Sequence, residues 1–101
     1  MTELSMSAEY ITRSIGEEAL YSQLAEEASE LAQAALKVAR VMHGTNPTPV
    51  SLAEAKGMVR EELTDVAQCA TYLGVNIDYE QVRSKEERWV KRISNAKTNK
   101  Y

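Results

Sequence analysis

The sequence contains one cysteine, one histidine, two prolines and no phenylalanine among its 101 residues. The single cysteine, Cys69, excludes a disulfide within the chain, and one cysteine with one histidine cannot supply the four ligands of a structural zinc site. No apolar run approaches the ~18 residues that a membrane span needs. The first six residues lack a basic region followed by an apolar stretch, so we expect no signal peptide. These scarcities predict a cytoplasmic protein without a membrane partner.

The length and composition fit one small domain. Hydrophobic residues make up 44% of the chain and charged residues 27%, which is ordinary for a globular protein. Alanine, glutamate and leucine are frequent, and these residues favour helix. A chain of this size buries only a modest core, so oligomerisation is a natural way to bury more. We therefore predict a single helical domain over residues 1–101.

Two long segments have apolar residues every three or four positions, which is the pattern of amphipathic helices. The first segment starts at Ser14, where Ser-x-x-Glu has the form of a capping box, and reaches about Met42. The loop 44–49 follows, because its two prolines exclude helix. The second segment starts at another capping box, at Ser51, and ends before Gly74.

Two shorter helices are expected near the ends of the chain. One covers about residues 7–14. The other begins after Asp78, an N-cap residue, and frays after about Ala96, leaving a basic tail at about 94–101 outside the ordered domain. Strand alternation is absent. The predicted fold class is all-α, an antiparallel helical bundle of about four helices that is completed by oligomerisation.

Each long helical segment contains one acidic run of the form Glu-Glu-x-x-acid. Glu27 with Glu30, and Glu62 with Asp65, are spaced so that each pair lies on one side of its helix. Glu27 and Glu62 also fall on the apolar stripes of their helices. Carboxylates at a bundle interior repel one another unless a cation lies among them, and clusters of oxygen ligands suit Mg²⁺ or Mn²⁺. We therefore predict these four acids to be metal ligands.

The acids that precede the two pairs, Glu26 and Glu61, are candidate catalytic residues. Either residue could take a proton from a water molecule. Two alternatives stay open for both: a side chain that contacts the metal ligands without binding the metal, or a side chain that is only solvated. An alternative for the core-facing acids Glu27 and Glu62 is that they rim the core and form ion pairs with nearby basic residues of the same helices. These basic residues are Lys37, Arg40, Lys56 and Arg60.

Charge is divided unevenly along the chain. Residues 1–82 carry 5 basic and 13 acidic side chains, whereas residues 83–101 carry 7 basic and 2 acidic ones. A cationic segment of this kind meets nucleic acid, anionic lipid or a phosphate-bearing small molecule, or it neutralises the acidic remainder. Lys85, Arg88 and Arg92 share one helical face and are candidate phosphate-binding residues.

The same helix is expected to bury an apolar stripe beside its cationic residues. Val82, Trp89 and Ile93 recur at helical spacing, which is more typical of core packing than of base stacking.

The acidic runs carry a family resemblance. The pattern Glu26-Glu27-x-x-Glu30-Leu31 followed by Glu62-x-x-Asp65-Val66 resembles the signature of the MazG-like, all-α nucleoside triphosphate pyrophosphohydrolases, over about residues 20–93. The resemblance implies that the four paired acids bind Mg²⁺. It also implies hydrolysis of an NTP or dNTP to a monophosphate and pyrophosphate, by a homodimer or homotetramer that keeps the nucleotide pool clean.

Other functions make different demands on the sequence. A helical nucleotide-binding or regulatory module that has lost catalysis would keep the same fold, and the intact acids disfavour it. A nucleic-acid-binding protein is disfavoured because no recognition motif occurs and residues 1–82 are acidic. A di-iron bundle would need Glu-x-x-His motifs, which this chain lacks.

Overall fold

The computed structural model describes residues 5–98, and within them the regular secondary structure is helix throughout, as predicted. Expectations for residues 1–4 and 99–101 lie outside this range. The four helices are α1 (Met6–Ile15), α2 (Glu17–His43), α3 (Leu52–Tyr72) and α4 (Tyr79–Lys97). None of the helices in this range is long and apolar enough to cross a membrane.

Two of the predicted helix starts are confirmed by their caps. The Ser51 hydroxyl oxygen accepts a hydrogen bond from the Glu54 backbone N–H at 3.1 Å and donates to the Glu54 carboxylate at 3.1 Å. Asp78 Oδ1 accepts from the backbone N–H groups of Glu80 and Gln81 at 3.0 and 3.1 Å. Each cap satisfies donors that a helix leaves open in its first turn, and so fixes where α3 and α4 begin.

The predicted capping box at Ser14 is wrong. Ser14 lies inside α1, and α2 begins at Glu17 without a side-chain cap. Between the two helices Gly16 adopts φ +90° and ψ 158°, a conformation that side chains strongly disfavour. The glycine therefore breaks the helix two residues later than the hydroxyl pattern suggested, and turns α1 across the base of α2.

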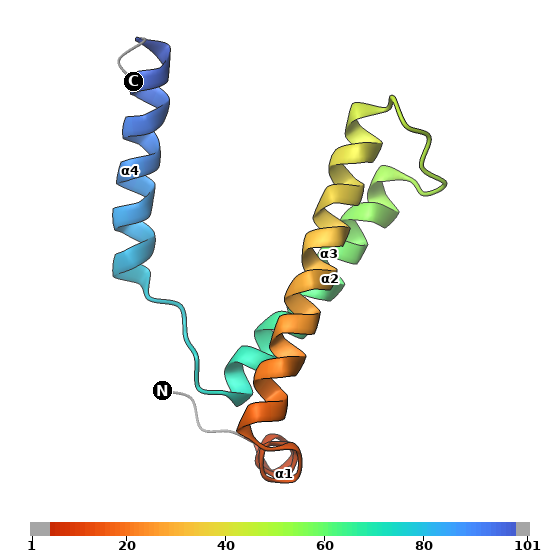
Figure 1. Cartoon of the computed structure of the whole chain (residues 1–101), viewed down its shortest axis with the longest axis vertical. Helices are drawn as coiled ribbons and strands as arrows, with labels where there is room; N and C mark the ends of the chain where they lie inside the picture. The colour runs from red at the N-terminus through yellow and green to blue at the C-terminus, as the bar shows by residue number, and fades with distance from the viewer. Residues whose placement is uncertain (1–4, 99–101) are drawn as a thin grey trace.

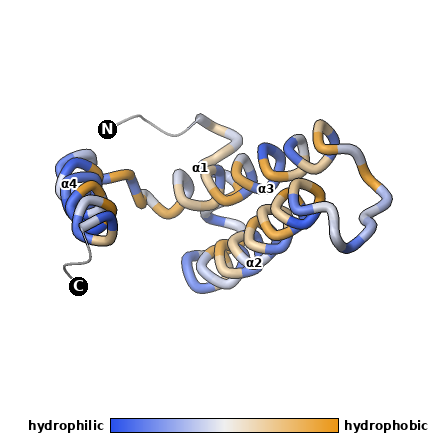
Figure 2. The backbone as a smooth tube through the Cα atoms, turned by 90° about the horizontal axis from the view of Figure 1, so that it is seen from above, coloured by the Kyte–Doolittle hydropathy of each residue, from blue (hydrophilic) through white to orange (hydrophobic). Residues whose placement is uncertain are grey.

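The core lies where α1, α2 and α3 meet. The antiparallel α2 and α3 run side by side, and α1 crosses their lower end and contacts both (Figures 1 and 2). Few residues of the described range are buried, and all but one of them have small side chains. They are Ala8, Leu20, Ala34, Ala55 and Cys69. Small side chains let α2 and α3 approach closely, and the free Cys69 is one of the buried residues. Burial raises the pKa of its thiol, and the charges of Glu27 and Asp65 raise it further.

The fourth helix stands apart from the other three. Both views show α4 beside the α2–α3 hairpin without touching it, and among the described residues it contacts no other helix (Figures 1 and 2). The prediction that its stripe is buried is therefore wrong for a single chain, since Val82, Trp89 and Ile93 are 46%, 63% and 48% exposed. Amphipathic spacing indicates that one face of a helix is apolar, but it does not identify the surface against which that face packs.

Helix α4 ends at Lys97, next to the predicted end at about Ala96, so residues 94–97 of the basic segment are helical. Lys97 lies in the last turn of α4, where a cation interacts favourably with the helix dipole.

Candidate metal centre

Three carboxylates from two helices meet halfway along the α2–α3 hairpin. Oxygen atoms of Glu27 and Glu30 on α2 and of Glu62 on α3 all lie within 4.8 Å of one another. Glu27 and Glu62 are half-buried and Glu30 is exposed. The helical spacing of three places Glu27 and Glu30 one turn apart, and the antiparallel packing of α3 brings Glu62 to the same level.

The two half-buried acids are incompletely satisfied. Glu27 Oε1 accepts a hydrogen bond from the Gln23 amide at 2.7 Å. Its other oxygen, Oε2, and Oε2 of Glu62 are buried and have no hydrogen-bond partner within the described part of the chain. A buried carboxylate oxygen without a partner costs free energy. The alternative in which both acids are neutralised by lysines and arginines of the hairpin therefore leaves these two oxygens unexplained.

Electrostatics at the cluster act most strongly on Glu62. Its pKa is raised above 4.5, first by burial and then by its hydrogen bond to, and charge repulsion from, Glu30. The charges of Asp65 and Glu27 raise it further. Asp65 therefore belongs to the same electrostatic environment, but it lies outside the group of three mutually close acids. Its role as a ligand stays a prediction.

The donor set fits a hard divalent cation. Three carboxylates supply oxygen ligands only, and Mg²⁺ and Mn²⁺ prefer such ligands while keeping positions for water or phosphate. A cation among Glu27, Glu30 and Glu62 would give the unpartnered Oε2 atoms a partner and remove the repulsion that raises the pKa of Glu62. The residues that would hold the cation are thus these three acids, with Asp65 beside them.

The two catalytic candidates have different surroundings. Glu61 lines a groove between α2 and α3 together with Glu30 and Glu62. Glu26 lines a separate hollow near the start of α2. Both side chains are exposed. The structure therefore brings Glu61, rather than Glu26, to the groove that contains two of the clustered acids.

Two of the cations that the sequence offered as ion-pair partners for the core-facing acids lie at this groove. Lys37 and Arg40 of α2 also line it, along with the apolar Leu36 and Met58. They follow Glu30 by seven and ten residues, which is the spacing of one helical face. This spacing predicts that both cations lie on the same side of α2 as Glu30.

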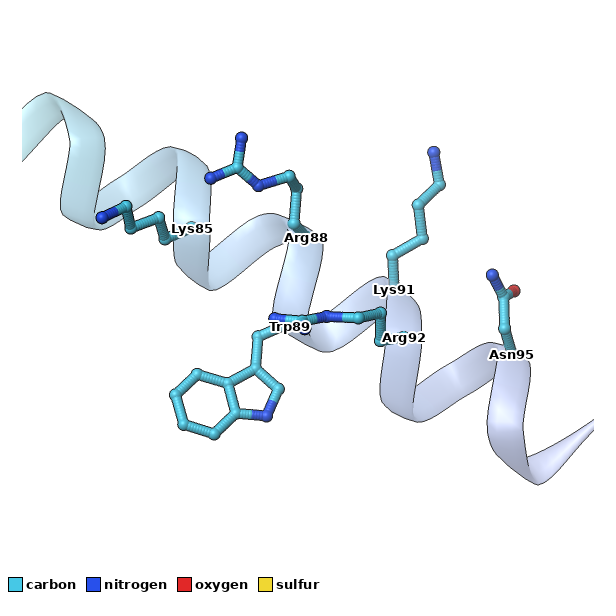
Figure 3. A pocket seen from close by; sticks show the side chains of 6 residues that line it. All are labelled: Lys85, Arg88, Trp89, Lys91, Arg92 and Asn95. Atoms are coloured by element: carbon cyan, nitrogen blue, oxygen red, sulfur yellow. The ribbon is translucent and has the colours of Figure 1, made fainter. Parts of the chain in front are cut away.

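The predicted phosphate-binding residues lie together but away from the carboxylates. Lys85, Arg88 and Arg92 line a shallow pocket on α4 with Trp89, Lys91 and Asn95 (Figure 3). In Figure 3 the Arg88 and Lys91 side chains extend from the same side of the helix. Because α4 contacts no helix of the hairpin within residues 5–98, a single chain does not bring these cations to the acidic cluster.

The chain matches no protein-family model, and neither a curated protein nor a solved structure is significantly similar to it.

Proposed function

We propose that this protein is an Mg²⁺-dependent nucleoside triphosphate pyrophosphohydrolase that acts in nucleotide-pool housecleaning, with Mn²⁺ as a substitute metal. The observation that carries the proposal is the cluster of Glu27, Glu30 and Glu62 with its two unpartnered, buried oxygens. The resemblance of the two acidic runs to the MazG-like signature supplies the reaction.

The reaction is a hydrolysis at the α-phosphate. Water attacks the α-phosphorus, the bond from this phosphorus to the oxygen bridging to the β-phosphate breaks, and pyrophosphate leaves. Glu27, Glu30 and Glu62, with Asp65 beside them, would hold a divalent cation, which would neutralise phosphate charge and make water a better nucleophile. Glu61 is the proposed acceptor of the proton that the water loses, because it is the candidate base that lines the same groove as Glu30 and Glu62.

A triphosphate also needs positive charge from the protein. Lys37 and Arg40 line the groove beside the acids, and Lys85, Arg88 and Arg92 form the cationic face of α4. Arginine suits phosphate because its planar guanidinium donates two parallel hydrogen bonds. We propose that these cations orient the β- and γ-phosphates, and that the working form is a homodimer or homotetramer.

The proposal is tested by incubating the protein with each NTP and dNTP in Mg²⁺ and identifying the products. A monophosphate and pyrophosphate are expected in equal amounts. Release of orthophosphate, or no turnover in either Mg²⁺ or Mn²⁺, would contradict the proposal. Nucleotide binding without turnover would instead support a regulatory module of the same fold.

Variants of the cluster sharpen this test. Glu30→Gln and Asp65→Asn are expected to abolish turnover while the far-UV circular dichroism stays helical. Glu18→Gln, which removes an exposed acid from the first turn of α2, is the matched control and is expected to retain activity. Activity retained in both cluster variants would remove the assignment of these acids as ligands.

A further inference from the structure

Helix α4 presents two kinds of surface that its own chain leaves uncovered. Val82, Trp89 and Ile93 form an apolar stripe that is about half exposed. Lys85 and Arg88 line a shallow pocket with Trp89, and Figure 3 shows the Arg88 side chain extending away from the indole. No residue of α4 is buried. Because most helical stability in proteins comes from tertiary packing of an amphipathic face, the stripe needs a surface to pack against.

The rest of the chain is also incomplete by itself. The radius of gyration is 18.1 Å, whereas a compact chain of this length has a value of about 13 Å. Among the described residues no large side chain is fully buried. A core this small supplies little stability, and small proteins with such cores commonly gain the remainder by association.

Charge indicates which surface α4 meets. Residues 17–72, which contain the hairpin, carry nine acidic and four basic side chains, whereas residues 79–97 carry six basic and three acidic ones. The groove of the hairpin contains Glu30, Glu61 and Glu62, the cations Lys37 and Arg40, and the apolar Leu36 and Met58. The hairpin segment as a whole is acidic and α4 is cationic, so their charges are complementary, and the apolar groove residues match the apolar stripe of α4.

The position of the acids along the hairpin can be compared with that of the cations along α4. Glu27 lies ten residues after the start of α2 and Glu62 ten residues before the end of α3, so both lie about 15 Å above the base of the hairpin. In Figure 1 the segment between α3 and α4 rises from this base before α4 begins. Lys85 and Arg88 lie six and nine residues from the start of α4, or about 9 and 14 Å along it. Both cations therefore lie between the start and the middle of α4, which is the half nearer the base.

The connection between α3 and α4 directs α4 away from its own hairpin. Gly74 adopts φ +72°, and the Val75 backbone N–H closes the end of α3 by donating to the Ala70 carbonyl at 2.9 Å. The chain then runs in non-helical conformation to Asp78, which caps α4 at a distance from α2 and α3 (Figure 1). This geometry favours a second copy over the same chain as the occupant of the groove's free side.

We infer that α4 of one copy packs on the α2–α3 hairpin of a second copy and places Lys85 and Arg88 beside the second copy's carboxylate cluster. A two-fold axis roughly parallel to the hairpins keeps the bases of both copies at one end, so the exchange is reciprocal. The site is then complete only in the dimer, with acids from one chain and cations from the other. The role of these cations toward a triphosphate depends on the proposed function, whereas the exchange itself does not.

Zero-length crosslinking tests the exchange without any variant. Equal amounts of ¹⁵N-labelled and unlabelled protein are mixed, unfolded and refolded together, and treated with a carbodiimide, which joins lysine amines only to carboxylates in contact with them. Peptides that join Lys85 or Lys91 to a hairpin acid such as Glu30, Glu61 or Glu62 are expected to be of mixed isotope in about half of the cases, since random dimers are half mixed.

Each other outcome would overturn the inference. Crosslinks from α4 to the hairpin within one isotope only would show that α4 folds back onto its own chain. Absence of such crosslinks, or a mass of a single 11.3 kDa chain in sedimentation at all concentrations, would show that α4 does not dock. Lys85→Gln combined with Lys91→Gln is the control, because it removes the amines and must remove the crosslinked peptides.

The two proposals fail separately. Mixed-isotope crosslinks without nucleotide hydrolysis would leave the exchange standing and contradict the pyrophosphohydrolase. Hydrolysis with single-isotope crosslinks would leave the enzyme standing and contradict the exchange.

Discussion

Glu27 on α2 and Glu62 on α3 bring carboxylate oxygens within 4.8 Å of each other, and each retains a buried oxygen without a hydrogen-bond partner. Two ionised carboxylates at this separation repel each other. The repulsion between the two carboxylates therefore disfavours the packing of α2 against α3 when no cation lies between them. Stability, metal binding and turnover should all depend on this pair.

Divalent cations are expected to stabilise the fold. At about 100 times the dissociation constant, a bound ion adds roughly 2.7 kcal/mol to the free energy of unfolding. For a domain of this size that corresponds to an increase in Tm of roughly 10 °C or more. Differential scanning fluorimetry at fixed protein concentration, with Mg²⁺ or Mn²⁺ against EDTA, measures it. Glu62→Gln should lose most of the increase and Glu18→Gln should keep it; equal increases in both would contradict binding at the cluster.

The stability of the metal-free protein is expected to fall as the pH rises through the range in which Glu62 ionises. The folded-state pKa of Glu62 is raised above 4.5 by burial and by its acidic neighbours, so its stabilising contribution is fully present below about pH 4.5. The contribution is lost as the pH rises through the folded-state pKa. Urea unfolding in EDTA from pH 4 to 8 should show Glu62→Gln matching the wild type at low pH and exceeding it at pH 7. Parallel curves would contradict the shift.

The two candidate bases are expected to differ in their effect on turnover. Glu61→Gln should lower kcat by about 100-fold or more, which is the usual contribution of a general base. Glu26→Gln should change it by less than about twofold, because Glu26 lies at a separate hollow and does not line the groove. The pH–rate profile of each variant provides the check, since loss of the base removes the acidic limb. The reverse order of effects would assign the role to Glu26.

Complementation between two inactive chains is expected if α4 is exchanged. One chain carries Glu62→Gln, and the other carries Lys85→Gln with Arg88→Gln. Refolded together in equal amounts, they should recover about a quarter of the wild-type rate, because half of the random dimers contain one complete site of two. Refolded separately, each should stay inactive. A mixture no more active than the two parents would place the acids and cations of one site on the same chain.

Close packing of α2 and α3 is expected to depend on Ala55. This side chain is fully buried, and a larger one at this position must push the helices apart. Ala55→Leu should lower the free energy of unfolding by about 1–3 kcal/mol, measured by urea unfolding. Ala53→Leu is the control, because Ala53 is exposed on the same helix and leucine is nearly as good a helix former there. Equal stability of the two variants would contradict the packing.

Local rules predicted most of the helices because they act within a few residues. The caps at Ser51 and Asp78 depend only on a side chain and the next turn, and both occur as predicted. Near Ser14 two local signals compete: the Ser-x-x-Glu pattern, which predicts a helix start at Ser14, and Gly16, which favours a helix end. The structure follows the glycine, since α1 continues through Ser14 and ends at Ile15, before the positive φ of Gly16. Periodicity also put Glu27 and Glu62 on the facing sides of two helices, so three of the four acids could be placed together.

The position of α4 was beyond such rules. Trp89 recurs at core spacing with Val82 and Ile93, yet all three are exposed, because periodicity describes one helix and not its neighbour. The same limit applies to Lys85 and Arg88, whose shared face could be predicted but whose distance from the acids could not. The sequence indicates that Lys37 and Arg40 share a helical face with Glu30, but only the structure shows that all three line one groove with residues of α3.

The small core has a consequence for how the protein behaves in a cell. Within residues 5–98 only five small or medium side chains are buried, and Trp89 is 63% exposed, so a single chain is open to proteases. In the dimer that we propose, the packing of α4 on the hairpin of a second copy protects each chain from proteolysis. Activity would then rise more steeply than the amount synthesised, so that scarce copies are degraded and abundant copies accumulate.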